Sequence, residues 1–312
     1  TASNDGFREL SGYDQQKIKV RSDFQWNSWM ASLKMTLTNL NQETAGYITG
    51  LNSYKDSSLN RKNLNPEAFR DANSQRLSLS LKREEENGIA LISPYIRKND
   101  MQFLQHFLPG TPVEENSHTS IGLLFKRFLE FRNFSFTGGF QIELAEAELI
   151  ETQSNRLTTS SAFNNATRPQ GKHYDYEVDS KVYALFGGIE DFYIGDDLLL
   201  YGDLRAESIK YDYNNRMNSG NVREDGTNCG FGGCYYNRPD DRSDSYNELS
   251  ARIGLTTDFD NVNYFLQASL GFRPPQINEA YRLQKKQKVS DLDSEKLTMI
   301  EIGTTFNLDN LD

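Results

Sequence analysis

Apolar and polar side chains alternate along most of the chain with a period of two. The stretch QRLSLSLK (75–82), for example, places a leucine at every second position. The same alternation recurs in LKMTLTN (33–39), RNFSFTGGFQIEL (132–144), NELSARIGLTTD (247–258) and NYFLQASLGF (263–272). A period of two indicates strands with one apolar and one polar face, and about eleven such segments follow one another.

The connections between these segments alternate between short and long. Tight turns are expected near 27–28, 86–88, 130–132, 191–196 and 258–261, and long polar connections near 41–73, 99–117, 147–173, 212–243 and 273–294. Strict alternation puts all the long connections at one end of the strands, as in outer-membrane barrels with short periplasmic turns and long extracellular loops. Loops this long are uncommon inside a compact soluble domain. The pattern therefore predicts an all-β fold, an antiparallel transmembrane β-barrel segment whose first strand, about 15–26, runs inward.

The polar face of the predicted strands carries many charged side chains. They include Lys34, Arg76, Lys82, Lys126, Arg205, Arg252 and Glu301. Small barrels fill their interior with side chains, whereas wide barrels have a hydrated or plugged lumen, so this many charges favour the wide lumen. The solvent-facing side of a soluble antiparallel sheet would alternate in the same way and stays open as an alternative.

The amino-acid composition fits both a membrane barrel and a soluble antiparallel sheet. The 312 residues have a mean hydropathy of −0.69 and 12% aromatic residues, and no run of about eighteen apolar residues could form a transmembrane helix. Such values suit a soluble protein or a barrel, because only alternate residues of a barrel strand must be apolar. The net charge of −10 argues against a nucleic-acid partner, which requires a basic surface. No signal peptide begins at Thr1, so we expect that one was removed or that the chain is a fragment.

Two stretches late in the chain combine a Pro-Pro turn, a polar loop and a strand with two glutamates. They are GFRPPQINEAYRLQ (271–284) and LDSEKLTMIEIG (292–303). This combination resembles a segment late in the barrel of TonB-dependent outer-membrane receptors. Residues 39–50, 65–84 and 101–123 are similar to barrel stretches of the siderophore-receptor-like group of that family. The resemblance covers nearly the whole chain and implies that residues 1–312 belong to a receptor β-barrel domain.

The family pattern also includes features that this sequence lacks. These receptors carry an N-terminal plug domain with an energy-coupling box and end on a strand with a terminal aromatic residue, whereas this chain ends in LDNLD. About eleven strands is half of the roughly 22 strands of plugged barrels. We therefore expect 1–312 to be a partial barrel domain, with no plug domain and no closing strand. Its open edges should make the isolated piece prone to aggregate.

The resemblance implies active uptake of a scarce ligand, first of all an Fe(III)-siderophore, across the outer membrane of a Gram-negative bacterium. The implied partners are the TonB energy-coupling complex, acting through a plug, and the surrounding outer-membrane lipid and lipopolysaccharide. Cobalamin, haem or an oligosaccharide stay open as cargo, and a passive porin is the alternative among membrane proteins. A surface β-sandwich adhesion module is the alternative from another class and predicts a soluble, folded isolated chain.

The two cysteines, Cys229 and Cys234, lie close together in the Gly-rich stretch NCGFGGC (228–234). A disulfide that closes such a small loop fits an oxidising compartment. A pair of free thiols is the alternative. A metal site is disfavoured because no other cysteine or histidine lies nearby.

Candidate ligand-binding residues lie close to the long connections. Arg273, Tyr281 and Arg282 are placed where an outer loop meets the barrel, and an arginine there could bind siderophore oxygens through charge-assisted hydrogen bonds. Tyr235 and Tyr236, beside the cysteines, are candidates to stack on a ligand or to join an aromatic girdle.

Arg273 also has a structural alternative, because Glu279 and Glu295 are within reach of an ion pair. Glu295 and Glu301 share a strand face but lie roughly 20 Å apart, which is too far for paired catalytic carboxylates. No serine–histidine–aspartate set, phosphate loop or metal-ligand cluster is visible in the sequence. We expect no enzymatic activity, no catalytic residue and no cofactor.

Met101 and His106 are the last candidates, as soft ligands for haem iron or another metal. Only three histidines are present, none at a metal-ligand spacing, and an ordinary loop histidine is the simpler interpretation. Haem receptors of the family carry a histidine in the loop after the FR-x-P element, but residues 273–294 contain none.

Overall fold

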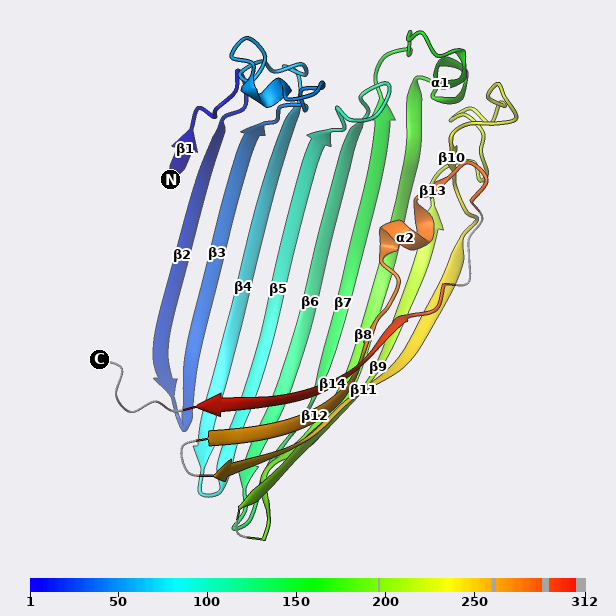
Figure 1. Cartoon of the computed structure of the whole chain (residues 1–312). Coiled ribbons are helices and arrows are strands. Elements are labelled where there is room, and N and C mark those ends of the chain that lie inside the picture. Colours follow the sequence, from blue (N-terminus) through cyan, green and yellow to red (C-terminus); the bar gives the residue numbers. More distant parts are fainter. Residues whose placement is uncertain (196, 260–261, 288–291, 307–312) are drawn as a thin grey trace.

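The computed structural model describes residues 1–195, 197–259, 262–287 and 292–306. Twelve strands form one antiparallel sheet in the order β1-β2-β3-β4-β5-β6-β7-β8-β9-β11-β12-β14, and β10 and β13 form a second, two-stranded sheet (Figure 1). The strands are β1 (Ala2–Asn4), β2 (Tyr13–Trp26), β3 (Trp29–Glu43), β4 (Phe69–Glu85), β5 (Gly88–Leu104), β6 (Val113–Glu130), β7 (Ser135–Gln153), β8 (Gly171–Ile194), β9 (Leu198–Asn215), β10 (Tyr236–Asn237), β11 (Arg242–Phe259), β12 (Val262–Arg273), β13 (Leu283–Gln284) and β14 (Glu295–Phe306). The helices are η1 (Ser53–Lys55), α1 (Ala162–Thr167) and α2 (Ile277–Tyr281). No helix in the described ranges is long and apolar enough to cross a membrane.

The large sheet is a single curved layer (Figure 1). Apart from the three-residue β1, its strands are 12 to 24 residues long. Within the described residues β1 and β14 are its two edges, each paired on one side only, so this part of the barrel wall is open. The prediction of an antiparallel barrel segment with about eleven long strands is confirmed. A sandwich of two packed sheets is excluded.

The register divides the sheet into an outer and an inner face. The inner face is the concave one, against which α2 lies (Figure 1). Directly paired residues share a face, and Leu77, Ile96 and Ile121 form one such row of exposed side chains on the outer face. The charged residues predicted to face inward all fall on the inner face: Lys34, Arg76, Lys82, Lys126, Arg205, Arg252 and Glu301.

The outer face carries a band of exposed apolar side chains. Among them are Val20, Leu185, Leu249, Ile253 and Ile302, which are 50% to 80% exposed. A continuous apolar surface of this extent fits the lipid-facing side of a membrane barrel. Trp26 and Trp29 lie on this face at the tight-turn end, where the Arg83 guanidinium lies 5.2 Å from the Trp29 ring. Amphipathic side chains of this kind are typical of the membrane interface.

The strands continue beyond the ends that the sequence predicted. The long connections run over 44–68, 105–112, 154–170, 216–241 and 274–294. The predicted connection 99–117 was therefore too long, because the outer face turns polar at Lys98 and Glu115 while the backbone ladder continues to Leu104 and Val113. Strict alternation ends where a strand leaves the lipid, and not where the strand itself ends.

The tight turns lie at the opposite end of the sheet from the long connections. Trp26 pairs with Trp29, and Glu85 with Gly88, across the first two of them, as predicted. Of the turns predicted at 191–196 and 258–261, residues 196, 260 and 261 lie outside the described residues.

Glycines on the inner face leave room for aromatic rings from a paired strand. Tyr95 pairs with Gly122, and a Cβ atom at Gly122 would lie 2.3 Å from Cζ of Tyr95. The same arrangement recurs at Tyr201 over Gly254 and at Phe265 over Gly303. A ring laid over a glycine fills the missing side-chain volume and helps to fix the register of the pair.

Candidate functional site

Three of the long connections fold together over the inner face of β8 and β9. We call the segments 154–170, 216–241 and 274–287 the loop cap (Figure 1). The pairing of β10 with β13 joins the second segment to the third. The Tyr235 amide donates a hydrogen bond to the Thr167 carbonyl at 2.9 Å and so joins the second segment to the first.

Tyrosines of the sheet form the floor of the loop cap. Tyr281 of α2 is fully buried and stacks on Tyr213 of β9, with ring centroids 4.5 Å apart. Its hydroxyl donates to Asp244 of β11 at 2.7 Å, and the Tyr174 hydroxyl donates to the Leu283 carbonyl at 2.6 Å. Burial is the main cause that raises the pKa of Tyr281, and the Asp244 carboxylate raises it further. Neutral phenols thus hold α2 against the wall by ring packing and by hydrogen bonds.

A buried ion cluster lies beside these tyrosines. The Arg282 guanidinium contacts Glu114 of β6 at 2.7 Å and also contacts Glu151 of β7, and these carboxylate side chains are only 5% and 6% exposed. His173 Nδ1 lies 2.9 Å from Glu151, and its Nε2 donates to the Pro169 carbonyl at 2.8 Å. Burial lowers the pKa of Arg282, but the two carboxylates outweigh that effect and raise it above its usual value. The arginine of the loop thus pairs with two carboxylates of the wall in a place that is largely shielded from water.

Arg238 fastens the second segment of the loop cap. Its guanidinium is 1% exposed and donates to the carbonyls of Asn218, His173 and Val222 at 2.7 to 2.9 Å. It also lies 5.1 Å from the ring of Tyr236, which stacks on His173 at 4.6 Å. Burial raises the pKa of Tyr236 to about 12. The segment is therefore pinned by backbone carbonyls around one buried cation.

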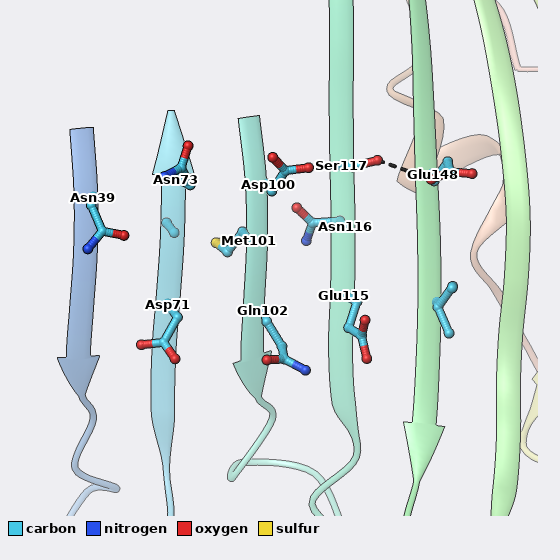
Figure 2. A pocket seen from close by; sticks show the side chains of 12 residues that line it. Asn39, Asp71, Asn73, Asp100, Met101, Gln102, Glu115, Asn116, Ser117 and Glu148 are labelled. Carbon is cyan, nitrogen blue, oxygen red and sulfur yellow. Dashed lines mark hydrogen bonds between the residues drawn. The ribbon is translucent and has the colours of Figure 1, made fainter. Parts of the chain in front are cut away.

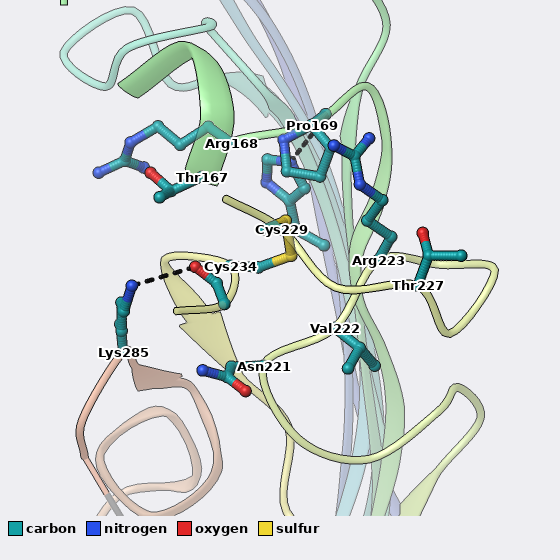
Figure 3. Close-up of a disulfide and its surroundings, with 12 residues drawn as sticks. Thr167, Arg168, Pro169, Asn221, Val222, Arg223, Thr227, Cys229, Cys234 and Lys285 are labelled. Carbon is teal, nitrogen blue, oxygen red and sulfur yellow. Dashed lines mark hydrogen bonds between the residues drawn. A yellow bond between two sulfur atoms is a disulfide. The ribbon is translucent and has the colours of Figure 1, made fainter. Parts of the chain in front are cut away.

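A disulfide joins Cys229 and Cys234 within the same segment, with Cα atoms 4.8 Å apart (Figure 3). The small loop that it closes carries Phe231, whose side chain is 61% exposed and whose φ is +56°. Lys285 of the third segment donates to the Gly233 carbonyl at 3.2 Å and to the Phe231 carbonyl. The disulfide and the lysine together hold Phe231 at the surface of the loop cap.

Aromatic rings and cations gather at the exposed end of the loop cap. We call Phe163, Arg168, Phe231, Tyr235 and Lys285 the tip cluster. Phe163 lies edge-on to Phe231 at a centroid distance of 5.5 Å. The Arg168 guanidinium lies 4.0 Å from the Tyr235 ring, and the Lys285 ammonium lies 5.7 Å from the Phe163 ring. A surface of this kind can hold a flat or anionic ligand by stacking and by charge-assisted hydrogen bonds.

Four of the predicted ligand-binding residues differ in their exposure: Tyr235, Tyr236, Tyr281 and Arg282. Tyr235 is half-buried and belongs to the tip cluster. Tyr236 and Tyr281 are 4% and 0% exposed, and Arg282 is held in the ion cluster. In the described structure these three residues build the loop cap from within, and a ligand would reach them only if the cap opened.

Arg273, the fifth candidate, lies at the end of β12. Its guanidinium contacts Glu279 at 3.1 Å and Glu295 at 3.0 Å. This is the structural alternative that the sequence offered, and a contact between Arg273 and a ligand stays a prediction.

Met101 and His106 lie apart from the loop cap. Met101 is part of β5, and His106 lies in the connection that follows, with its ring edge-on to Phe107 at 5.6 Å. Within the part of the chain that the structure describes, the one group of three or more acidic, histidine or cysteine side chains close enough to share a metal consists of Glu146, Glu177 and Asp179. That group contains neither candidate.

The outer face above the apolar band is polar and acidic. A hollow of about 380 Å³ lies in this surface, and Figure 2 shows the side chains that line it. Its lining includes Asn39, Asp71, Asn73, Asp100, Glu115 and Glu148. The register places these side chains on the face opposite to the loop cap, so the hollow is separate from the tip cluster.

The sequence analysis missed most of the tip cluster. Phe163, Arg168, Phe231 and Lys285 come from three connections that only the fold brings together. One signal was present, because Phe231 stands between glycines inside CGFGGC, where an aromatic ring has no hydrophobic neighbours to pack against.

Comparison with known proteins decides the family. The family model described as "TonB dependent receptor-like, beta-barrel" matches residues 5–312. The chain belongs to this family. Its members are receptors and transporters of the Gram-negative outer membrane and are not enzymes, which agrees with the apolar band on the outer face of this receptor chain.

Solved receptors share the sheet of this receptor chain at low sequence identity. The ferric citrate transporter FecA in its unliganded form gives a TM-score of 0.69 at 12% identity, over 96% of this chain and 42% of that one. The siderophore receptor PiuA from Acinetobacter baumannii gives 0.67 at 13% identity, over 99% and 50%. The ferric-catecholate import receptor Fiu from E. coli K12 gives 0.69 at 13% identity, over 97% and 50%. The chain thus spans half the length of these proteins or less, and no curated protein matches it.

Proposed function

We propose that this receptor chain forms the ligand-capturing wall of an outer-membrane receptor for an Fe(III)-siderophore. The tip cluster carries the proposal, because it presents exposed rings and two cations at the end of the barrel where the long connections emerge. Ferric siderophores display flat or anionic oxygen-rich groups, against which rings stack and to which arginine and lysine donate. Solved structures named as siderophore receptors share the fold and so support this ligand class.

Residues 1–312 supply part of the barrel domain in this proposal. The remaining wall and a plug belong to a longer protein, in line with the half-length match to the solved receptors. The TonB complex delivers energy through that plug, and outer-membrane lipid and lipopolysaccharide surround the apolar band.

Uptake of radioactive iron by cells that make the receptor tests the proposal. Iron is supplied as a catecholate, a citrate or a hydroxamate complex to cells with and without the receptor. We expect receptor-dependent uptake of one class that stops when the energy supply of the inner membrane collapses. The double change Phe231→Ala and Lys285→Gln should lower this uptake by about tenfold or more, because an exposed ring and its neighbouring cation act together.

Tyr54→Ala serves as the matched control, since Tyr54 is a 65% exposed ring in another connection. Equal uptake with and without the receptor would exclude iron complexes as cargo, and cobalamin, haem and oligosaccharides would be tested next. Uptake that continues without energy would favour a passive porin. Tryptophan fluorescence would be a poor reporter, because Trp26 and Trp29 lie at the opposite end of the strands from the loop cap.

A further inference from the structure

The ladder between β7 and β8 contains a β-bulge, and His173 is its extra residue. Glu151 pairs with Tyr174, whereas the next residue of β7, Thr152, pairs with Lys172, so no residue of β7 lies opposite His173. A bulge turns a side chain out of the regular alternation of its strand. Here it places the His173 ring beneath the loop cap and beside Glu151, where the side chain is 2% exposed. Described residues alone bury this ring, so its contacts do not depend on what else fills the barrel.

Both ring nitrogens of His173 face oxygen atoms that accept hydrogen bonds. Nδ1 lies 2.9 Å from Oε1 of Glu151, and Nε2 lies 2.8 Å from the carbonyl oxygen of Pro169. A carbonyl oxygen can only accept a hydrogen bond, and the same holds for an ionised carboxylate. A neutral imidazole has a single N–H group, and its other nitrogen is an acceptor. Both contacts are therefore hydrogen bonds only when the ring carries a proton on each nitrogen.

The surroundings of Glu151 keep its carboxylate ionised. The Arg282 guanidinium contacts the second oxygen of this carboxylate, Oε2. Burial raises the pKa of Glu151, but the hydrogen bond from His173 and the charge of Arg282 outweigh burial and hold the pKa below its usual value. The proton between the two residues therefore belongs to the imidazolium of His173 and not to a carboxylic acid.

The imidazolium balances the charge of its surroundings. Together with Arg282 it neutralises the carboxylates of Glu114 and Glu151. The Tyr236 ring stacks on it at 4.6 Å and favours a cation, whereas the Arg238 guanidinium, bound to the His173 carbonyl at 2.9 Å, opposes one. The titratable groups packed around the ring come from the wall and from all three segments of the loop cap: Glu114, Glu151, Arg168, Tyr174, Tyr236, Arg238 and Arg282.

The hydrogen bond to Pro169 fixes the end of the first segment of the loop cap. Pro169 follows Arg168, whose guanidinium lies 4.0 Å from the Tyr235 ring in the tip cluster. Other hydrogen bonds of this segment need no mobile proton, because Gln153 donates to the Arg168 carbonyl at 3.1 Å and the Tyr235 amide also holds the segment.

Loss of one proton from the ring would act on the Pro169 contact first. The remaining N–H would stay with the carboxylate of Glu151, because a charged acceptor binds it more strongly than a carbonyl does. The lone pair of Nε2 would then face the carbonyl oxygen of Pro169, and the two atoms would repel each other. The Pro169 end of the segment would move away while the rest of the segment stays attached.

We propose that His173 is a proton-dependent latch of the loop cap. While both ring nitrogens carry protons, the ring ties Pro169 to Glu151 and keeps Arg168 over the Tyr235 ring. As the pH rises through the range in which histidine loses its proton, the tie to Pro169 breaks and Arg168 loses its fixed place in the tip cluster. The effect on ligand capture rests on the proposed function, whereas the latch itself does not.

Hydrogen exchange at different pH values tests the latch on the full-length receptor in detergent. Protection factors, the ratio of intrinsic to observed exchange rates, remove the direct effect of pH on amide exchange. We expect the protection of 162–170 to fall by about tenfold or more between about pH 5 and about pH 8. The protection of 274–287 should stay unchanged, because Arg282 holds that segment at either pH. An equal fall in both segments, or constant protection of 162–170, would overturn the latch.

His173→Gln separates the latch from other effects of pH. Its amide donates N–H bonds at every pH, so the protection of 162–170 should vary by less than about twofold over the same range. His106→Gln and His118→Gln are the matched controls, because they are the other two histidines of the chain, and both should keep the tenfold fall. A fall that persists in the His173 variant, or that disappears in a control, would overturn the latch. If the His173 variant also loses protection of 113–130, its sheet is disturbed and the profile of the unaltered protein decides alone.

Iron uptake by His173→Gln cells, divided by uptake by unaltered cells, tests the link to ligand capture. This ratio cancels the effects of pH on the energy supply and on the iron complex. We expect a ratio near one at about pH 6 and of about threefold or more at about pH 8, because only the unaltered receptor loses the place of Arg168. A constant ratio would overturn the link between the latch and the tip cluster. Protection that depends on pH in a protein that takes up no iron complex would remove the proposed function and leave the latch in place.

Discussion

The wall formed by β2 to β5 and the wall formed by β8 to β11 belong to one sheet but differ on their inner faces. In the first wall, inner side chains such as Lys19 and Arg76 are exposed and no described connection covers them. In the second wall, Tyr174, Tyr176 and Tyr213 are 4%, 2% and 3% exposed beneath the loop cap. Backbone pairing is continuous through both walls. The difference therefore comes from the side chains and from the connections that they can hold.

Tyrosine suits the covered wall because its ring packs while its hydroxyl satisfies a polar group of the loop above. Lysine suits the open wall because its ammonium stays in water while its methylene stem lies along the sheet. One architecture thus provides a surface that fixes loops and a surface that no described connection covers. Four experiments test this difference between the two walls.

The largest effect is expected from Arg282→Met, which removes the cation between Glu114 and Glu151. Breaking a buried ion pair from one side costs about 3 to 5 kcal/mol, so the loop cap should separate from the wall. Hydrogen exchange of 216–241 and 274–287 should speed up accordingly. Arg273→Met is the matched control, because its exposed ion pairs contribute at most about 1 kcal/mol. Unchanged exchange in the Arg282 variant would show that the ion cluster does not hold the cap.

On the uncapped side, Gly122→Val tests whether aromatic rings stabilise the open wall. The new side chain would overlap the Tyr95 ring and displace the hydroxyl that donates to Glu143. Overpacking of this kind costs about 1 to 3 kcal/mol, which a lower urea midpoint in detergent would reveal. Gly271→Ala is the control, since nothing lies within 4 Å of a Cβ atom there. Equal midpoints for the two variants would contradict the packing role of Tyr95.

Replacing Cys229 and Cys234 by serine should loosen the tip of the covered wall. Closing a loop this short stabilises it by about 2 kcal/mol, and the disulfide lies within the loop cap alone. We expect faster proteolysis around Phe231, while the sheet keeps its unfolding midpoint. Loss of the whole fold on reduction would mean that the disulfide supports both walls.

The smallest effect is expected from pH, through Tyr236. Its pKa is raised to about 12 by burial, whereas in the unfolded chain it lies at about 10. Between these values the unfolded chain releases a proton that the folded chain keeps, so the stability is fully present below pH 10 and falls above it. Tyr236 alone contributes at most about 1.4 kcal/mol per pH unit to this slope. Tyr236→Phe should flatten the fall of the urea midpoint with rising pH, and an unaltered slope would exclude this residue as its source.

The sequence predicted the sheet, its two faces and its tight-turn end. It did so because alternate residues of a barrel strand face lipid and water, which require apolar and polar side chains respectively. Above the lipid both faces are polar, so the pattern faded near Lys98 although β5 continues to Leu104. Of the loop cap, the sequence predicted only the disulfide between Cys229 and Cys234, which lie close together in the chain. Phe163 and Lys285 meet through tertiary structure, and no spacing in the chain encodes that contact.

The length of β8 determines how far the loop cap stands from the membrane. Its 24 residues extend about 80 Å at roughly 3.3 Å per residue, and a tilt of roughly 40° leaves a height of about 60 Å. The hydrocarbon core is about 30 Å thick, so roughly half of the strand rises clear of it. Shortening β8 and its neighbours in register would lower the tip cluster toward the lipid without changing any of its residues. The height of the tip cluster above the membrane is therefore set by strand length, independently of the residues that would contact a ligand.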